Sequence, residues 1–330
     1  MNPVPFFEII RDDLAQVEDV LRRVTQLDYP LLGPVLAPII QSGGKRLRPA
    51  LVILSARLGT YDQARILPVA ASVEVLHTAT LVHDDLVDNS LLRRGMPTLN
   101  ARLDSRVVIL VGDYLFAKSA ELAAEPQNTE INTIFAHTMG IICRGELGQI
   151  FGSPGWRLSR EEYLQKIYSK TASLFVAAME AGAILSGASP EKRQALSDYA
   201  RYLGIAFQIA DDILDFVGSE QELGKPVGSD LRQGTVTLPT IRFLEQHPAP
   251  NPVRDYLEQE RKSANQQISK SQESLQRALE AVRHSPAIDQ AYSEAYAFAR
   301  QAQEALAIFP DDPYRQALLT LADYVVQRRK

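Results

Sequence analysis

Two apolar segments of the sequence carry the same acidic pattern, Asp-Asp-x-x-Asp, and this repetition constrains the fold more than any other feature. The six aspartates are Asp84, Asp85 and Asp88 in the first box, and Asp211, Asp212 and Asp215 in the second box. Within a helix, the first and last aspartates of a box lie one turn apart on the same face. Carboxylates rarely cluster on an apolar helix unless a cation compensates them. The pair of boxes therefore predicts one negative pocket, in which two helices present their carboxylates to each other.

Two other acidic pairs, Asp12-Asp13 and Asp311-Asp312, provide a comparison within the chain because they lack the third aspartate. Acidic residues of this kind are typical of ordinary solvated helix starts. A solvated, charged helix face is also the alternative interpretation of either box taken alone. The recurrence of the full box in two apolar segments favours the pocket.

Composition and charge limit the class of protein. The net charge of -5 and the pI near 5.7 argue against a nucleic-acid-binding protein, which usually carries a basic stripe. Cys143 is the single cysteine, which excludes internal disulfides and fits a reducing compartment. The N-terminal sequence lacks the pattern of a secretion signal, and the longest apolar run, residues 107–117, is interrupted by Asp113. We expect a cytoplasmic protein with no membrane span.

Helical periodicity extends along nearly the whole chain, and no segment shows a convincing strand alternation. The expected helices are residues 5–27, 63–92, 101–124, 129–150, 160–187, 190–217, 253–283, 286–308 and 312–329. A longer irregular segment, residues 218–239, follows the second box and is typical of a functional lid. The hydrophobic content of 45% suffices for a large core. The prediction is one all-α domain over residues 1–330, a bundle of mostly antiparallel helices around a central cavity.

The chemistry of the boxes points to a hard divalent cation and a phosphorylated substrate. Mg²⁺ prefers a few carboxylates together with waters and substrate phosphates. Basic side chains stand at turns and helix ends where long side chains can reach inward: Lys45, Arg46, Arg48, Arg93, Arg94, Lys170, Lys225 and Arg232. Taken singly, each is an ordinary solvated cation; together they predict two anion sites, one bridged by metal and one formed by protein cations. Three Mg²⁺ ions and three protein cations would balance six carboxylates and a diphosphate of about -3.

Several further motifs accompany the boxes, and no nucleotide-binding Gly-x-x-x-x-Gly-Lys-Ser/Thr loop is present. They are Gly43-Gly-Lys-Arg-Leu-Arg-Pro49, Arg93-Arg94-Gly95, Lys170-Thr171, Phe207-Gln208 and Gly224-Lys225-Pro226. In this order and spacing, over residues 40–240, the sequence resembles the trans-isoprenyl diphosphate synthases. The resemblance implies Mg²⁺-dependent condensation of isopentenyl diphosphate with an allylic prenyl diphosphate, catalysed by a homodimer.

The resemblance also implies a role for each matching residue. The metal ligands on the allylic diphosphate would be Asp84, Asp85, Asp88 and Asp211, with Asp212 and Asp215 in support. The cations on that diphosphate would be Arg93, Lys170 and Lys225. The residues that bind isopentenyl diphosphate would be Lys45, Arg48, His77 and Arg94. Thr171 and Gln208 would turn oxygen dipoles toward the developing allylic cation.

Two positions leave alternatives open. His77 alone could be a core histidine, but it stands seven residues before Asp84, on the same helical stripe, which favours the site. Members of the family often have a lysine near Thr235. Here either Arg232 supplies that charge, or the allylic diphosphate is held by one cation fewer.

Small residues before the first box predict a long product, about C30 to C50, whose apolar chain would allow it to pass to a membrane. Short-chain members of the family often place an aromatic residue five positions before the box, where this chain has Ala79. A growing chain would pass Thr80, Leu76 and Val73 toward the N-terminal end of that helix. Alternatively, the small residues only allow close helix packing, and a floor on another helix stops the product at C15 to C20.

Two rival functions remain open from the sequence, a class I terpene cyclase and a non-catalytic subunit of a heteromeric synthase. A cyclase normally replaces the second aspartate box by an Asn/Ser/Glu-type metal box, and a non-catalytic subunit should have lost acidic residues. The two intact boxes count against both. The sequence leaves the exact chain length, the allylic primer and the pathway open.

Overall fold

The structure is a computed structural model that describes residues 5–26, 33–41, 44–93, 95–151, 158–218, 227–266 and 272–327. Its elements are helical apart from one pair of two-residue strands, which confirms the predicted all-α class. The chain forms two compact units. The first comprises Met1–Ile141, Ser173–Arg201 and Ala302–Leu321, and the second comprises Ile142–Ala172, Tyr202–Gln301 and Ala322–Lys330. A single domain over residues 1–330 stays a prediction.

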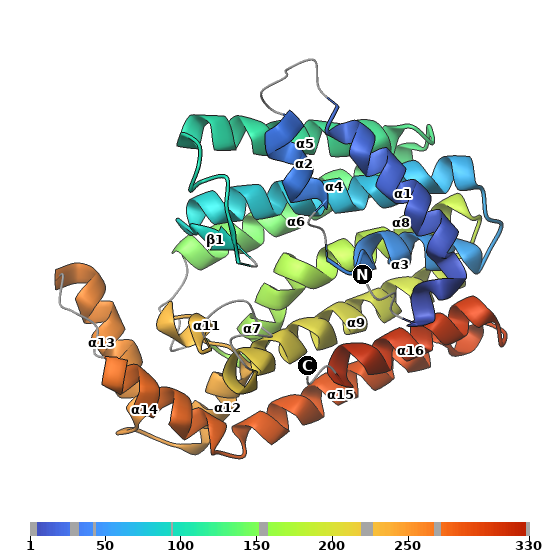
Figure 1. Cartoon of the computed structure of the whole chain (residues 1–330). Helices are drawn as coiled ribbons and strands as arrows, with labels where there is room; N and C mark the ends of the chain where they lie inside the picture. The colour runs from blue at the N-terminus through green and yellow to red at the C-terminus, as the bar shows by residue number, and fades with distance from the viewer. Residues whose placement is uncertain are drawn as a thin grey trace. The chain divides into compact units, whose positions relative to one another are not determined.

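The first unit is built around one buried helix. Its elements are η1 (Pro5–Ile10), α1 (Arg11–Val24), α2 (Gly33–Gln41), α3 (Leu47–Arg57), α4 (Gln63–Val87), β1 (Leu92–Arg93), β2 (Met96–Pro97), α5 (Ser105–Ala124), the first part of α6 (Thr129–Phe151), α8 (Ser173–Leu185), the first part of α9 (Pro190–Val217), η4 (Leu306–Ile308) and most of α16 (Pro313–Gln327). Helix α4 packs beside α5 and also contacts α1, α3 and α8 (Figure 1). Most of its residues are buried, so the helix that carries the first box is the core of this unit.

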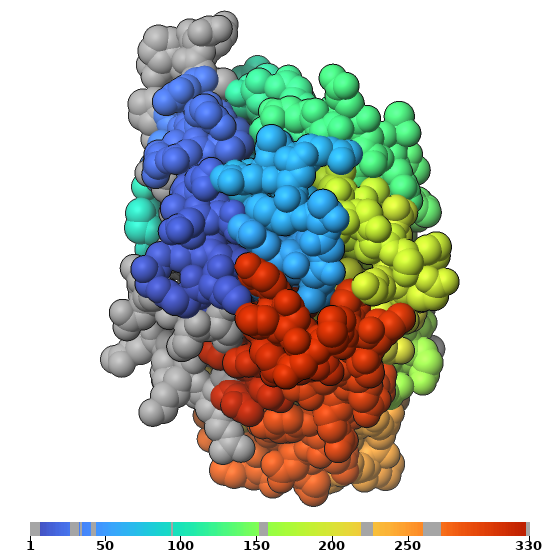
Figure 2. Space-filling model, turned by 90° about the vertical axis from the view of Figure 1, so that its right-hand side faces the viewer, coloured from blue at the N-terminus to red at the C-terminus, as the bar shows by residue number. Residues whose placement is uncertain are grey.

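Close helix contacts fix α4 and α3 in place. The hydroxyl of Ser72 in α4 donates to the backbone carbonyl of Ser119 in α5 at 2.7 Å, and Ser119 returns a bond to the carbonyl of Ser72 at 3.0 Å. On the other side, Gly182 of α8 lies so close to α3 that a Cβ there would collide with Ser55. Arg57, at the end of α3, lies over the ring of Tyr314 in α16 at 5.7 Å, and Figure 2 shows the red C-terminal segment next to this blue part of the chain.

The second unit supports the second box. It contains the end of α6, α7 (Arg160–Ile167), the π-helix η3 (Tyr168–Ala172), the second part of α9, α11 (Ser229–Arg232), α12 (Leu238–Gln246), α13 (Pro252–Gln266), α14 (Gln272–Arg283) and most of α15 (Ala287–Ala305). Helices α13 and α14 pack on each other, and α12 contacts both of them as well as α7 (Figure 1). The box residues lie in the last two turns of α9, next to buried Ile209, Ile213 and Phe216.

The structure corrects several predicted boundaries. The helix expected over residues 63–92 ends at Val87, because Asn89 takes a left-handed conformation with φ of 49° that a continuing helix does not allow. Gly95, which follows that expected helix, lies in the turn of the β1–β2 hairpin with φ of 74°. The segment 160–187 is divided by the π-helix, and the segment expected to be irregular, 218–239, contains α11 and the start of α12.

One described helix, α4, is long and apolar enough to cross a membrane by length and composition. However, 78% of its most apolar window is buried inside the structure, which is the pattern of a core helix.

Candidate active site

The first box stands at the C-terminal end of α4. Asp84 and Asp85 lie in its last turn, and Asp88 caps the helix with its backbone N–H, which donates to the carbonyl of Asp84 at 2.8 Å. A helix C-terminus carries negative partial charge, so three carboxylates there are electrostatically unfavourable without a cation. Asp84 is half-buried and Asp88 is exposed, which leaves both within reach of a solvated ion.

Asp85 is the buried member of the first box. Arg93, on β1, donates from Nε to both of its carboxylate oxygens at 2.9 and 3.1 Å. Burial raises the pKa of Asp85, and the Arg93 guanidinium opposes that shift. The hairpin that the sequence did not predict therefore brings a predicted diphosphate-binding cation onto a predicted metal ligand.

The carboxylates of the second box differ in environment. Asp211 is half-buried, whereas Asp212 and Asp215 are buried. Oδ2 of Asp215 accepts a bond from the backbone N–H of Asp230 at 3.0 Å, and the carbonyl of Asp215 accepts from Gly228 at 2.8 Å. Asp215 therefore holds the start of α11 against the end of α9.

Asp212 accepts bonds on both of its oxygens. Gln208 donates from Nε2 to Oδ1 at 2.8 Å, and the hydroxyl of Tyr163 donates to Oδ2 at 2.7 Å. Burial raises the pKa of Asp212 to about 7, aided by the negative charge of Asp230 and opposed by these two hydrogen bonds. A carboxyl group that resists ionisation in this way marks a site suited to a compensating cation.

The π-helix η3 carries the predicted pair Lys170 and Thr171. Thr171 donates from Oγ1 to Oε1 of Gln208 at 2.8 Å, so the two residues expected to face the allylic cation are directly bonded. Close packing holds this segment: a Cβ at Gly204 of α9 would come within 2.6 Å of Ala172, and one at Gly145 of α6 within 2.7 Å of Ser169. Single π-helical turns inside helices often occur at functional sites.

Two residues near the second box were missed by the sequence analysis, Tyr163 and Lys166. They lie seven and four residues before Lys170, and this spacing on one helical stripe was the available signal. Lys166 is half-buried; burial and the neighbouring Lys170 lower its pKa, while Asp212, Asp230 and Glu146 oppose the shift. Lys170 itself lies with Nζ 3.6 Å from Oε1 of Glu146.

The predicted isopentenyl diphosphate residues belong to the first unit. Lys45 is exposed and Arg48 is half-buried, with its guanidinium 5.3 Å from the centre of the Phe175 ring. His77 is half-buried on α4, on the same helix as Asp84. Whether these side chains converge on one anion stays a prediction, and Arg94 and Lys225 lie outside the described residues.

Arg46 corrects the sequence analysis, which grouped it with the substrate cations. Its guanidinium is buried, donates to Glu74 at 2.9 Å and to the Ile40 carbonyl at 2.8 Å, and also binds Glu18. The backbone of Arg46 is left-handed with φ of 50°, which turns the side chain inward. Arg46 is therefore a structural anchor of the turn that presents Lys45 and Arg48.

The predicted chain-length residues lie within the buried core of α4. Ala79, Leu76 and Val73 are buried, and Thr80 is half-buried with its hydroxyl donating to the His77 carbonyl at 2.8 Å. Their role in measuring the product stays a prediction.

The carboxylates suit Mg²⁺, which waters and substrate phosphates help to coordinate, better than they suit an ion that needs protein ligands alone. Among the residues that the structure describes, no three His, Cys, Asp or Glu side chains converge into a complete metal site. Mg²⁺ commonly takes only one or two carboxylates and completes its octahedron with waters and substrate phosphates. The first box belongs to the first unit and the second box to the second, so their meeting around shared ions stays a prediction.

Comparison with known proteins identifies the family. The polyprenyl synthetase family matches residues 30–275. The chain is similar to octaprenyl diphosphate synthase of Escherichia coli K12, at 35% identity over 99% of both chains, and to heptaprenyl diphosphate synthase component 2 of Bacillus subtilis, at 36% identity over 98% of this chain and 90% of that one. Among solved structures, it resembles polyprenyl synthase of Caulobacter crescentus complexed with calcium and isoprenyl diphosphate, with a TM-score of 0.90, 37% identity, and coverage of 98% and 97%. These matches confirm the predicted resemblance, and the chain belongs to the polyprenyl synthetase family.

Proposed function

We propose that this prenyltransferase is a long-chain all-trans polyprenyl diphosphate synthase, which condenses isopentenyl diphosphate with an allylic prenyl diphosphate. The observation that carries the proposal is the hydrogen-bonded chain of side chains Thr171–Gln208–Asp212. It joins the residues expected to face an allylic cation to the second aspartate box. Octaprenyl and heptaprenyl diphosphate synthases among the relatives support the long product.

We infer that the carboxylates of the two boxes would hold the leaving diphosphate through divalent ions. Asp84 and Asp88 present carboxylates at the negative end of α4, and Asp211 presents one near the end of α9. When bound, Mg²⁺ neutralises charge that develops on the departing diphosphate and so lowers the barrier to breaking the allylic C–O bond. We expect three such ions, as in the charge balance drawn from the sequence.

Thr171 and Gln208 act on the allylic carbon. Asp212 accepts a hydrogen bond from the side-chain amide of Gln208. The Gln208 carbonyl oxygen therefore turns toward Thr171 and accepts a hydrogen bond from its hydroxyl. The remaining lone pairs of both oxygens are negative ends of fixed dipoles. Preorganised dipoles of this kind stabilise a developing positive charge without reorganisation. No protein nucleophile is required, because the double bond of isopentenyl diphosphate attacks and the released diphosphate can accept the proton.

The cations divide between the two substrates. Arg93, Lys170 and Lys225 bind the allylic diphosphate, and the residues that bind isopentenyl diphosphate are Lys45, Arg48, His77 and Arg94. Lys166 adds a cation beside Asp230, whose carbonyl accepts the backbone N–H of Thr235 at 2.8 Å. We propose that Lys166 supplies positive charge in place of the lysine that the family often has near Thr235.

The product leaves the boxes along α4, past Ala79, Thr80, Leu76 and Val73. Small side chains at Ala79 and Thr80 would leave room for the growing chain on this side, and that chain would gain hydrophobic contacts with each added unit. Products of C15 to C20 are the alternative, which the named long-chain relatives make less favoured.

We propose that the enzyme is a cytoplasmic homodimer. The exposed face of α5 supports a partner, because Ile109 and Leu110 are 45% and 66% exposed on adjacent positions. A second copy is the proposed occupant, and the mass of the purified protein in solution tests it: a monomer at micromolar concentration contradicts it.

Incorporation of labelled isopentenyl diphosphate tests the proposed reaction. The purified chain with farnesyl diphosphate and Mg²⁺ should convert the label into an extractable apolar diphosphate, and excess EDTA should stop it. A terpene cyclase would release diphosphate from the allylic substrate without using the label. A non-catalytic subunit would do neither.

A further inference from the structure

Tyr163 is a buried tyrosine that none of the roles above involves. It is 1% exposed, and its hydroxyl donates to Oδ2 of Asp212 at 2.7 Å. It lies in the second turn of α7, whose start is fixed by a capping box in which Ser159 accepts the N–H of Glu162 and Glu162 accepts the N–H of Ser159. The position of Tyr163 along its helix is thus set locally.

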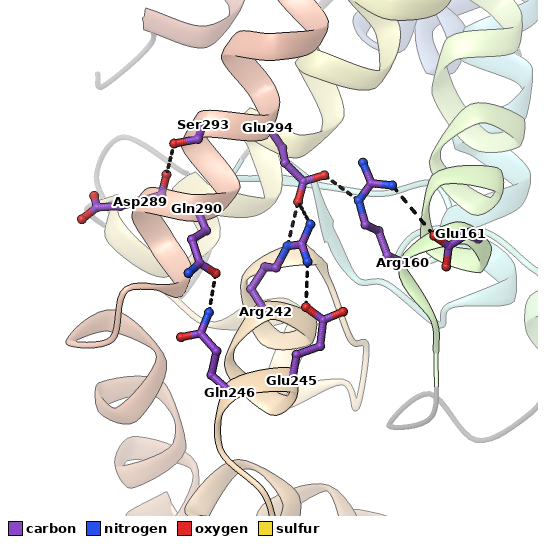
Figure 3. Close-up of polar contacts among 9 residues, drawn as sticks. All are labelled: Arg160, Glu161, Arg242, Glu245, Gln246, Asp289, Gln290, Ser293 and Glu294. Carbon is purple, nitrogen blue, oxygen red and sulfur yellow. Dashed lines mark hydrogen bonds and ion pairs between the residues drawn. The ribbon is translucent and has the colours of Figure 1, made fainter.

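A second set of contacts, made by Arg160, Glu294 and Arg242, holds the same end of α7. Arg160, in the first turn, donates from Nε to Oε2 of Glu294 in α15 at 2.7 Å. Oε1 of the same carboxylate accepts Nε of Arg242 in α12 at 2.7 Å, and Arg242 also binds Glu245 at 2.7 Å. Figure 3 shows Arg160 and Arg242 reaching Glu294 from two different helices. Because the Glu294 side chain is only 16% exposed, this bridge is shielded from solvent and ties three helices together.

The hydrogen bonds on Asp212 have a fixed direction. Both oxygens of Asp212 accept, Oδ1 from Gln208 and Oδ2 from Tyr163, so Gln208 turns its NH₂ group toward Asp212 and its carbonyl oxygen toward Thr171. Thr171 has one hydroxyl proton, which this bond uses. The donor-to-acceptor direction of the hydrogen-bonded chain Thr171–Gln208–Asp212 is therefore set at Asp212, whose second oxygen accepts from Tyr163.

We propose that Tyr163 is a positioning residue for prenyl transfer: its hydroxyl fixes the Asp212 carboxylate and, through it, the orientation of Gln208 and Thr171. This inference rests on the proposed function. Tyr163 touches no substrate in this account; it acts through Asp212, so its loss should slow the chemical step and leave substrate binding unchanged.

The substitution Tyr163→Phe removes only the hydroxyl, and the chain offers a matched control. Tyr199 is also buried, and its hydroxyl donates to the backbone carbonyl of Leu318 at 2.7 Å, in the first unit. Tyr199→Phe therefore removes the same group and one buried hydrogen bond without touching either box. We expect Tyr163→Phe to lower kcat about 10- to 100-fold, as small misplacements of reacting groups do, with both KM values within about twofold of wild type. Tyr199→Phe should keep kcat within about twofold.

A double-mutant cycle of Tyr163→Phe with Thr171→Val tests whether these two residues, at the ends of the hydrogen-bonded chain, act together. If Tyr163 works through Gln208 and Thr171, the double variant should be about as slow as the slower single variant. Effects on kcat that multiply would show that Tyr163 and Thr171 act independently, and so overturn the inference.

Selective ¹⁵N labelling of glutamine gives a readout that does not require turnover. The side-chain amide signal of Gln208, assigned by its loss in Gln208→Leu, should shift in Tyr163→Phe and stay in place in Tyr199→Phe. An unchanged Gln208 signal, or equal kcat in the two tyrosine variants, contradicts the inference. Failure of the wild-type enzyme to condense the substrates would instead contradict the proposed function. The Gln208 signal would still test whether Tyr163 orients Gln208 through Asp212.

Discussion

Arg93 donates from Nε to both carboxylate oxygens of Asp85, at 2.9 and 3.1 Å. The sequence predicts that Asp85 binds metal and that Arg93 binds the allylic diphosphate. In this structure the two side chains are paired with each other, so the predicted binding of substrate and ions would have to compete with this pair. The same pair keeps a buried carboxylate compensated until then.

Substitution of Arg93 should affect both binding and stability. Arg93→Ala should raise the KM for the allylic diphosphate about 10-fold, because a charge-assisted contact is lost. It should also lower the free energy of unfolding by about 1 kcal/mol, since the pair is partly solvated. Arg106→Ala is the control: Arg106 pairs with Asp104 but is 89% exposed. Steady-state kinetics and denaturant unfolding measure both effects, and equal KM values for the two variants would contradict the role of Arg93.

The first box should be essential for turnover and dispensable for folding. Asp84→Ala, or Asp211→Ala in the second box, should lower kcat 10²-fold or more, since each removes a charge that holds the metal. The melting temperature should change little. Asp113→Ala, at an exposed position of α5, should keep kcat near that of the wild type. Near-normal turnover of either box variant at limiting Mg²⁺ would exclude the boxes as the metal site.

Two adjacent cations should have different functions. Lys45→Ala should raise the KM for isopentenyl diphosphate selectively, about 10-fold, and leave the melting temperature unchanged, because Lys45 is exposed. Arg46→Ala should instead destabilise the fold by about 3–5 kcal/mol, because it leaves the carboxylates of Glu18 and Glu74 without their buried partner. Kinetics with each substrate varied in turn, together with denaturant unfolding, separates the two. A Lys45 variant with equal effects on both substrates would show that the two anion sites are wrongly divided.

The sequence predicted the helical class, the family and the location of the boxes, because these depend on local periodicity and on short motifs. Other features depend on contacts between distant segments. Arg46 lies in a basic motif, yet its guanidinium pairs with the carboxylates of Glu18 and Glu74. These residues lie 28 positions before and 28 positions after it in the sequence. The helix that carries the first box ends early because Asn89 adopts a left-handed conformation, and the periodic pattern continues past it. Tyr163 could be placed against Asp212 only once the packing of α7 on α9 was known.

Bulky residues near the first box should shorten the product. Ala79→Tyr or Thr80→Phe should shift products to C15 or C20 without blocking the first condensation, because the added ring fills the path along α4. Ala79 is fully buried, so the larger side chain will also cost stability of about 1–3 kcal/mol. Ala50→Val, another fully buried small position in α3, controls for overpacking and should leave chain length unchanged. Unaltered products in both bulky variants would place the floor of the pocket on another helix.

The chain length of the wild-type product tests the central claim most directly. The purified enzyme is incubated with Mg²⁺, farnesyl diphosphate and an excess of labelled isopentenyl diphosphate, and the products are dephosphorylated and sized by chromatography. A long-chain synthase should give labelled products of about C30 to C50, with shorter species only as transient intermediates. Products that stop at C15 or C20, or the absence of any labelled prenyl product, would contradict it.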